Sequence, residues 1–221
     1  MPPERVPRAP VRWWLAAVLA VAIAGYAFRY VIFGERAYVP ELAPSFAARP
    51  WLIWAHALFG PIALVTGIVN LLPALRHPPR WILHRWTGRV YVTSALLTGA
   101  AGLGLSVFAS GGAVARAGFA LLALAVLGAT TRGFVAIRSA VAIRTHREWM
   151  LRSYALIFAA VTLRIWLPLL IVAYGGQFVP AYRWVAWLSW VPNVIAVEWM
   201  IHRGWRPPFR LTRSIAAPTA V

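Results

Sequence analysis

Histidine is the residue type in this chain best suited to metal or proton chemistry. A neutral imidazole can ligate an iron or accept a proton near neutral pH. The chain has no cysteine and no aspartate, which excludes thiolate metal sites, disulfides, cysteine nucleophiles and aspartyl catalysis. The histidines are His56, His77, His84, His146 and His202.

Three of these histidines begin similar short motifs. His84-Arg85-Trp86 is followed by Arg89 and Tyr91, and His146-Arg147 is followed by Trp149, Arg152 and Tyr154. A third motif reads His202-Arg203-Gly204-Trp205. The first two motifs each open a helix after an apolar run. They therefore favour a tandem duplication of a two-helix unit, over roughly 50–112 and 113–173.

The first two motifs could hold a haem b. Axial imidazoles must reach one iron from matching depths, and His84 and His146 share a level at one end of the predicted helices. His77 is a further candidate at that level, whereas His56 lies about a membrane thickness away. The arginines beside the pair could bind haem propionates; they are Arg85, Arg89, Arg147 and Arg152. The alternative is that these motifs only anchor the chain to anionic lipid head groups.

A second candidate site lies deep in the predicted bundle. Arg164 falls within an apolar run, and an arginine at such depth usually faces a partner or a cavity. His56 is expected in the same half, so the two could line one ligand pocket that takes a quinone head group or an anionic substrate. Alternatively, helix carbonyls or snorkelling satisfy Arg164. Glu198 is expected to pair with Arg132 near the other end of the helices.

The elements that position these residues are membrane helices. Hydrophobic residues make up 61% of the 221 residues and charged residues 12%, and the mean hydropathy is +0.69. This composition excludes an ordinary soluble enzyme, a disordered chain and a secreted disulfide scaffold. The apolar runs predict an all-α transmembrane bundle of about six helices. The expected helices cover 12–33, 51–72, 89–109, 114–136, 151–173 and 183–201.

Charge predicts the orientation of this bundle. The net charge is +17, all 22 basic residues are arginine, and these arginines lie between apolar runs, which indicates topology rather than nucleic-acid binding. Fifteen of the 22 arginines fall on the side of the N-terminus and four on the other. We therefore expect both termini in the cytoplasm of a bacterial plasma membrane. The predicted parts are a cytoplasmic N-terminus over 1–11, one transmembrane domain over 12–206 and a cytoplasmic tail over 207–221.

Several of these positions resemble one known family. They are His56-x-x-x-Gly60 with Gly67, the motif that starts at His84, the motif from His146 through Arg152-Ser153-Tyr154, and Thr162-Leu163-Arg164. Over about 50–170 they resemble the bacterial multi-pass membrane proteins of domain-of-unknown-function family 2306. The resemblance implies an inner-membrane protein without a settled biochemical role, and its histidine pattern is similar to that of small b-type cytochromes only by analogy.

Two functional hypotheses follow. The first is a redox protein that binds haem b through His84 and His146 and a quinone near His56 and Arg164. The second is a non-redox membrane protein, either a small-molecule carrier or an assembly factor, that holds no haem. Neither hypothesis identifies a catalysed reaction.

Overall fold

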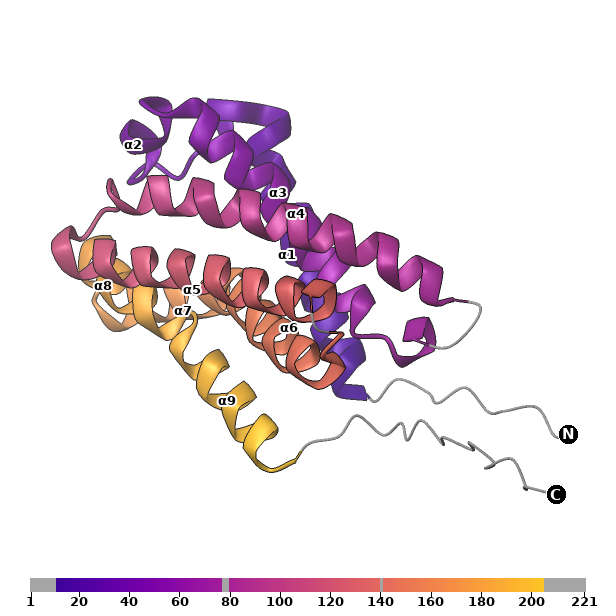
Figure 1. Cartoon of the computed structure of the whole chain (residues 1–221). Helices are drawn as coiled ribbons and strands as arrows, with labels where there is room; N and C mark the ends of the chain where they lie inside the picture. Colours follow the sequence, from indigo (N-terminus) through magenta and orange to yellow (C-terminus); the bar gives the residue numbers. More distant parts are fainter. Residues whose placement is uncertain (1–10, 77–79, 140, 205–221) are drawn as a thin grey trace, which may run out of the picture.

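The computed structural model describes residues 11–76, 80–139 and 141–204, and within them the chain is helical without strands (Figure 1). His77 and the chain ends beyond these ranges, including the predicted tail over 207–221, lie outside the described residues. The α-helices are α1 (Val11–Phe33), α2 (Ala43–Ala47), α3 (Pro50–Asn70), α4 (Trp81–Ser106), α5 (Gly112–Ser139), α6 (Ile143–Ile157), α7 (Ala159–Ala173), α8 (Phe178–Leu188) and α9 (Val191–His202). Two 3₁₀ turns, η1 (Gly34–Ala37) and η2 (Pro73–Arg76), follow α1 and α3.

The predicted membrane helix bundle is confirmed. Five helical stretches in the described residues are long and apolar enough to cross a bilayer: Trp13–Ala37, Pro50–Asn70, Gly112–Ser139, Ile143–Ala173 and Phe178–His202. With 26 residues, α4 is also long enough, but its arginines, glycines, serines and threonines lower its hydropathy. Together with α4, these stretches agree with the expected number of about six.

The helix boundaries differ from expectation at two places. α4 begins at Trp81 and α6 at Ile143, whereas starts at 89 and 151 were expected. The motifs at His84 and His146 therefore lie inside helices, and the histidine of each motif lies in the first turn. Polar residues can form these turns because their side chains bond along the helix: Arg144 donates to Glu148 Oε1, four residues later, at 2.9 Å. Apolar periodicity alone does not detect such polar first turns.

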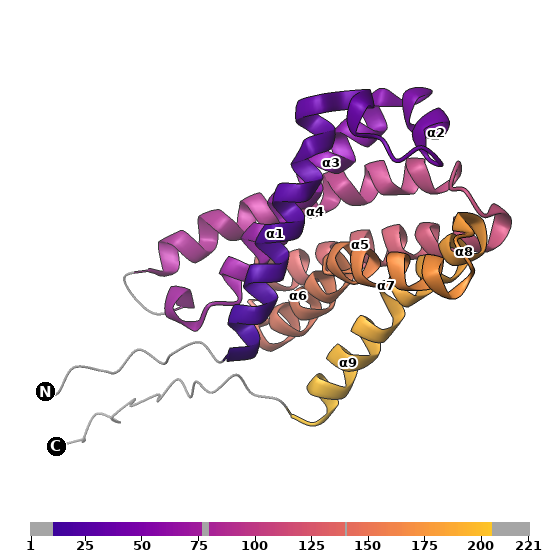
Figure 2. The ribbon, with the colours of Figure 1, turned by 180° about the vertical axis from the view of Figure 1, so that it is seen from behind.

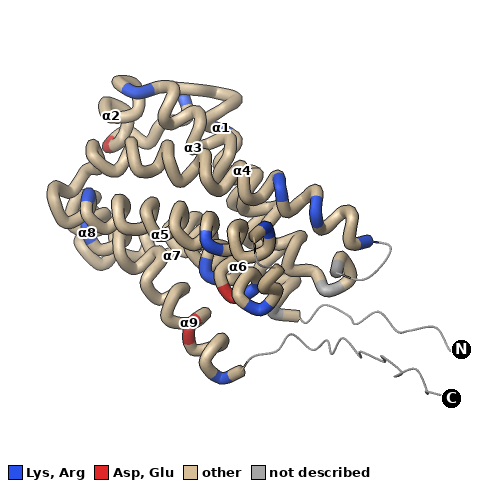
Figure 3. The backbone as a smooth tube through the Cα atoms, in the orientation of Figure 1, with Lys and Arg blue, Asp and Glu red and all other residues tan. Residues whose placement is uncertain are grey.

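The two ends of the bundle carry different residues. We call the end where α4 and α6 begin and α9 ends the motif end, and the opposite end, beside α2, the α2 end (Figure 1). Arginines gather over the first turns of α4 and over α6, at the motif end (Figure 3). The bundle thus separates charge along its length, as the arginine counts predict. The placement of the motif end in the cytoplasm stays a prediction.

Packing follows the order of the chain. α4 packs against α3, α6 packs against α5, and α7 packs against α8. α1 crosses α3 on the face seen in Figure 2. The hairpins α3–α4 and α5–α6 thus follow one another as the predicted repeat requires, although the duplication itself stays a prediction.

A buried hydroxyl cluster joins the two hairpins. Ser153 Oγ lies 2.7 Å from Tyr91 Oη and 2.7 Å from Thr130 Oγ1, so α4, α5 and α6 meet there. Tyr154 donates to Leu64 O at 3.2 Å. Gly67 is required beside these rings, because a Cβ atom there would come within 2.8 Å of Tyr91. This tight packing fixes the positions of α3, α4 and α6 relative to one another.

Two of the membrane-spanning stretches are broken. α6 gives way to α7 at Phe158, and α8 gives way to α9 at Ser189 and Trp190. Side chains satisfy the carbonyls at the breaks: Asn193 Nδ2 donates to Ala155 O at 3.2 Å and to Ser189 O at 3.1 Å. Thr162 Oγ1 also donates to Ser189 O. Irregular backbone is tolerated at membrane depth only where protein groups bond to it in this way.

Candidate functional site

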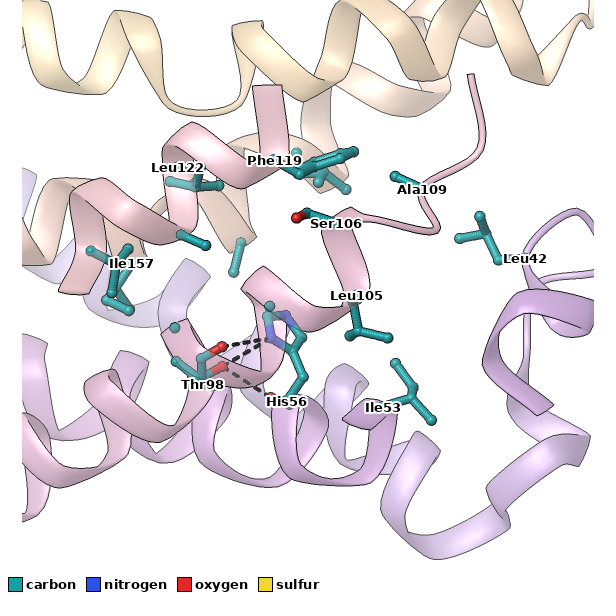
Figure 4. A pocket seen from close by; sticks show the side chains of 18 of the residues that line it. Leu42, Ile53, His56, Thr98, Leu105, Ser106, Ala109, Phe119, Leu122 and Ile157 are labelled. Atoms are coloured by element: carbon teal, nitrogen blue, oxygen red, sulfur yellow. Dashed lines mark hydrogen bonds between the residues drawn. The ribbon is translucent and has the colours of Figure 1, made fainter. Parts of the chain in front are cut away.

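A cavity of about 230 Å³ is lined mainly by α3, α4, α5 and α7, with further residues from α2, α6 and α8. Most of its lining is aliphatic or aromatic, including Ile53, Leu122 and Phe119. Figure 4 shows these side chains around the cavity. A largely apolar cavity with a few polar groups is the usual form of a small-molecule site. The polar side chains that line it therefore decide what it could bind.

His56 supplies one of these groups from α3. Its Nδ1 lies 3.1 Å from Thr98 O and 3.1 Å from Thr98 Oγ1, both on α4 (Figure 4). A bond to the carbonyl oxygen requires the hydrogen on Nδ1, and in that tautomer of the neutral ring Nε2 carries a lone pair; the bond to Thr98 Oγ1 is compatible with either tautomer. The side chain remains exposed, and its ring extends toward the space between α4 and α5 (Figure 4). His56 therefore offers a hydrogen-bond acceptor to the cavity.

A glycine on α4 makes room for this ring. A Cβ atom at Gly102 would lie 3.3 Å from both Cε1 and Nδ1 of His56. That distance is closer than most side-chain contacts, so the ring fits because residue 102 has no side chain. Thr98 and Gly102 are functional candidates that the sequence did not single out. The one feature of the sequence that could have indicated them is the run of small residues in this part of α4.

Arg164 lines the same cavity from α7. It is half-buried, its Nη1 donates to Ala160 O at 2.8 Å, and its Cζ lies 5.6 Å from the centre of the Tyr26 ring. The ion pairs found among the described residues join Arg144 to Glu148 and Glu198 to Arg152 and His202, all toward the motif end. Arg164 therefore brings a positive charge to the cavity, and its observed contacts are with neutral groups.

The structure thus brings His56 and Arg164 to one cavity, whereas three other polar residues of the neighbouring helices do not line it. Tyr26 and Arg29 lie on α1, where Tyr26 contacts Arg164 and lines a separate groove. Asn193 bonds to the helix breaks instead. The cavity combines an acceptor with a cationic donor inside an apolar wall, so it can hold a ligand that has both a hydroxyl and a carbonyl or oxyanion.

The residues predicted to hold a haem lie at the motif end. His84 and His146 are half-buried in the first turns of α4 and α6, and His146 Nδ1 lies 2.8 Å from Gly133 O. Tyr91 and Ser153, which bond to each other, each lie seven residues beyond one of these histidines. The histidines therefore lie at similar distances from a point where α4 and α6 touch. No group of three or more potential metal ligands occurs within the described ranges.

The arginines near these histidines have varied surroundings. Arg85 lies over the Trp81 ring at 5.8 Å and Arg89 over the Trp86 ring at 4.8 Å, and both arginines are exposed. Arg147, also predicted to bind a propionate, is half-buried on α6. These exposed cation–π pairs are typical of an interfacial belt as well as of an anion site.

The ion pair predicted between Glu198 and Arg132 is wrong. Arg152 binds Glu198 through both nitrogens, with Nε donating to Oε1 at 2.5 Å and Nη2 to Oε2 at 2.9 Å. Arg132 instead lies over the Trp149 ring at 4.9 Å. Counting residues along the helices places Arg132 and Arg152 at similar depths. The packing of α6 against α9 brings Arg152, and not Arg132, to Glu198. Arg152 is thus already paired with a carboxylate.

Comparison with known proteins identifies a family but no close relative. The family described as "Predicted membrane protein (DUF2306)" matches residues 53–201. The match extends beyond the 50–170 expected from the motifs, so it includes α8 and α9 as well as both cavity residues. Neither a curated protein nor a solved structure matches the chain.

Proposed function

Starting from the fact that the chain belongs to the DUF2306 family of predicted membrane proteins, we propose that it binds the head group of a lipid-soluble quinone or quinol. The observation that carries this proposal is the placement of His56 and Arg164 on one apolar cavity. The proposed site lies among membrane-spanning helices, where ligands of this class dissolve.

The two polar groups match the two oxygens of a quinol. His56 Nε2 would accept a hydrogen bond from one hydroxyl, because Thr98 holds the hydrogen on Nδ1. The guanidinium of Arg164 would donate to the opposite oxygen, with the larger strength of a charged donor. A quinone has no hydroxyl, so it would keep the hydrogen bond from Arg164 and lose the hydrogen bond to His56 Nε2.

The size and lining of the cavity also favour a single ring. Drug-sized ligands occupy pockets of about 300–1,000 Å³. The cavity here holds about 230 Å³ and is lined mainly by apolar side chains. A substituted six-membered ring with two oxygens suits this volume better than a large or strongly hydrated substrate. An ordinary polar metabolite would leave most of its hydrogen-bonding groups unpaired.

The test is to measure binding of duroquinone and of its reduced form to the purified protein in a neutral detergent. His56→Leu removes the acceptor, so we expect the quinol to bind about 2- to 13-fold more weakly, as one neutral hydrogen bond predicts. The affinity for the quinone should stay nearly constant. His202→Leu is the control, because His202 is exposed at the motif end. No saturable binding, or equal effects of the two substitutions, would contradict the proposal.

A haem between His84 and His146 is a second candidate. Two observations favour it: the equal spacing of these residues from the contact between α4 and α6, and the bond that fixes His146 Nδ1 and leaves Nε2 for a ligand. The haem would add one-electron redox chemistry at the motif end. A reduced-minus-oxidised absorption spectrum should then lose its haem bands in His84→Ala and in His146→Ala, but not in His202→Ala. Quinol binding without any haem would favour the non-redox carrier or accessory role.

The location proposed for this activity is the bacterial plasma membrane, with the motif end in the cytoplasm. The basis is the arginine excess at that end, where the exposed Arg85 and Arg89 would also contact anionic lipid head groups.

A further inference from the structure

Two arginines from different helices face one tyrosine ring at the contact between α1 and α7. Arg29 Cζ lies 4.1 Å from the centre of the Tyr26 ring, and Arg164 Cζ lies 5.6 Å from it. Arg29 Nη2 also donates to Tyr30 Oη at 3.2 Å. Both arginines belong to membrane-spanning stretches, so two positive charges converge where a single one is already costly.

Neutral groups are the observed partners of this pair. Tyr26 and Tyr30 contact Arg29, and a backbone carbonyl accepts from Arg164. Arg29 Nε is buried and has no hydrogen-bond partner in the described part of the chain. A buried donor without an acceptor is unfavourable, and more so when it is charged. The pair therefore has both the charge and an unused donor to bind an anion.

An apolar groove adjoins Arg164 and the Tyr26 ring that both arginines face, whereas Arg29 contacts that ring without lining the groove. It has a volume of about 440 Å³ and is lined by Ile23 and Tyr26 of α1 and by Arg164, Leu167, Pro168 and Ile171 of α7. A small hydrophilic anion would leave these aliphatic side chains uncovered or facing lipid. An anion with an apolar body would cover them and place its charge against the guanidinium groups.

We propose that this groove binds an amphiphilic carboxylate, such as a fatty acid, between α1 and α7. Its carboxylate would bridge Arg29 and Arg164, and its chain would contact Ile23, Leu167 and Ile171. Guanidinium groups bind carboxylates in a planar, two-point geometry. The small carboxylate also suits the depth, because Arg164 lies nine residues, or about 14 Å, from the end of α7 at Ala173. A bulky phosphodiester head group would have to leave the interface to reach it.

This site is separate from the proposed quinone site, although Arg164 lines both spaces. Arg29 and Ile171 do not line the cavity, and His56 does not line the groove. Substitutions at these positions therefore test the two proposals independently.

The experiment is native mass spectrometry of the full chain in a neutral detergent, titrated with oleate and, separately, with oleyl alcohol. We expect one oleate to bind, with an affinity at least about tenfold above that of the alcohol, because the two probes differ only in the charged head. Arg29→Gln should remove this preference. Arg36→Gln is the control, since Arg36 is exposed on η1 at the same end of the bundle. Equal binding of the two probes, or equal effects of the two substitutions, would overturn the proposal.

Three further measurements cover misfolding, the nature of the anion and the independence of the two proposed sites. Ile171→Trp fills the groove while both arginines remain, and it should weaken oleate at least about tenfold. Unchanged oleate binding in this variant would overturn the proposed position of the fatty-acid tail in the groove. Acetate should not displace oleate at equal concentration. Displacement would overturn the proposal that the groove selects an amphiphilic carboxylate, and would indicate a site for a small free anion. His56→Leu should leave oleate binding unchanged, so loss of quinol binding alone leaves this proposal standing.

Discussion

Arg164→Met is the perturbation that best separates a ligand-binding role of Arg164 from a structural one. Methionine is unbranched and apolar, so it covers a similar surface without the charge. Removing a charged donor from a bound oxygen weakens binding by about 1.5–3 kcal/mol. At about 1.4 kcal/mol for each factor of ten, the affinity for duroquinone should fall about 10- to 140-fold.

The same substitution should leave the stability of the protein unchanged or raise it. An arginine at the centre of a membrane helix costs about 2.5–3.5 kcal/mol on insertion scales. Its observed hydrogen bond goes to Ala160 O, a carbonyl of its own helix, and such a bond contributes about 0.5–1.5 kcal/mol. The Tyr26 ring adds a cation–π contact of about 0.5–1 kcal/mol. The cost still equals or exceeds these contributions together, so the melting temperature should not fall.

The assay measures duroquinone affinity and melting temperature on the same detergent-purified samples. Arg183→Met is the matched control, because Arg183 also donates to a backbone carbonyl, Gly111 O at 3.0 Å, but is exposed at the α2 end and does not line the cavity. The reasoning is refuted if both variants bind duroquinone equally well. It is also refuted if Arg164→Met loses affinity together with stability, since Arg164 would then act by holding the fold.

Three other outcomes follow from the packing and the charge pattern. Gly67→Ala should lower the free energy of unfolding by about 1–3 kcal/mol, because its methyl group would overlap the packed tyrosine rings; a denaturation series measures this, and an unchanged midpoint contradicts it. Arg152→Ala and Glu198→Ala should show a coupling of about 0.5–3 kcal/mol in a double-mutant cycle, whereas additive effects would mean that their bond is not formed. In this cysteine-free chain, single cysteines at Glu41 and Arg85 should react with an impermeant thiol reagent from opposite faces of the membrane, with Arg85 on the cytoplasmic face; labelling of both from one face refutes the predicted topology.

The sequence predicts the bundle well because long apolar runs have few alternatives in a membrane. It also predicts the shared depth of His56 and Arg164, since depth follows from counting residues along a helix. The structure then places both on one cavity. Counting residues does not tell in which direction a side chain points around its helix axis, because that direction depends on how the neighbouring helices pack.

Other features depend on contacts that the sequence does not encode locally. Two arginines of similar depth could reach Glu198, and only the packing of α6 beside α9 selects Arg152 over Arg132. The helix breaks at Phe158 and Ser189 carry no glycine, and the prolines of α7 and α9 do not mark both of them. Pro192 lies in the first turn of α9, where proline is well tolerated, but Pro168 lies inside a continuous α7.

The two helix breaks have a mechanical consequence. They lie side by side, bridged by Asn193 and Thr162, and they bound the hairpin formed by α7 and α8. The breaks separate this hairpin from α6 and α9, and α8 is held to the beginning of α5, where Trp187 Nε1 donates to Val114 O at 3.2 Å. Arg164 lies on this hairpin and lines both the cavity and the groove along α1, so a shift of α7 would change both spaces together. We expect faster amide hydrogen exchange at these two breaks than in α3 and α4, and uniform protection would show that the hairpin is locked.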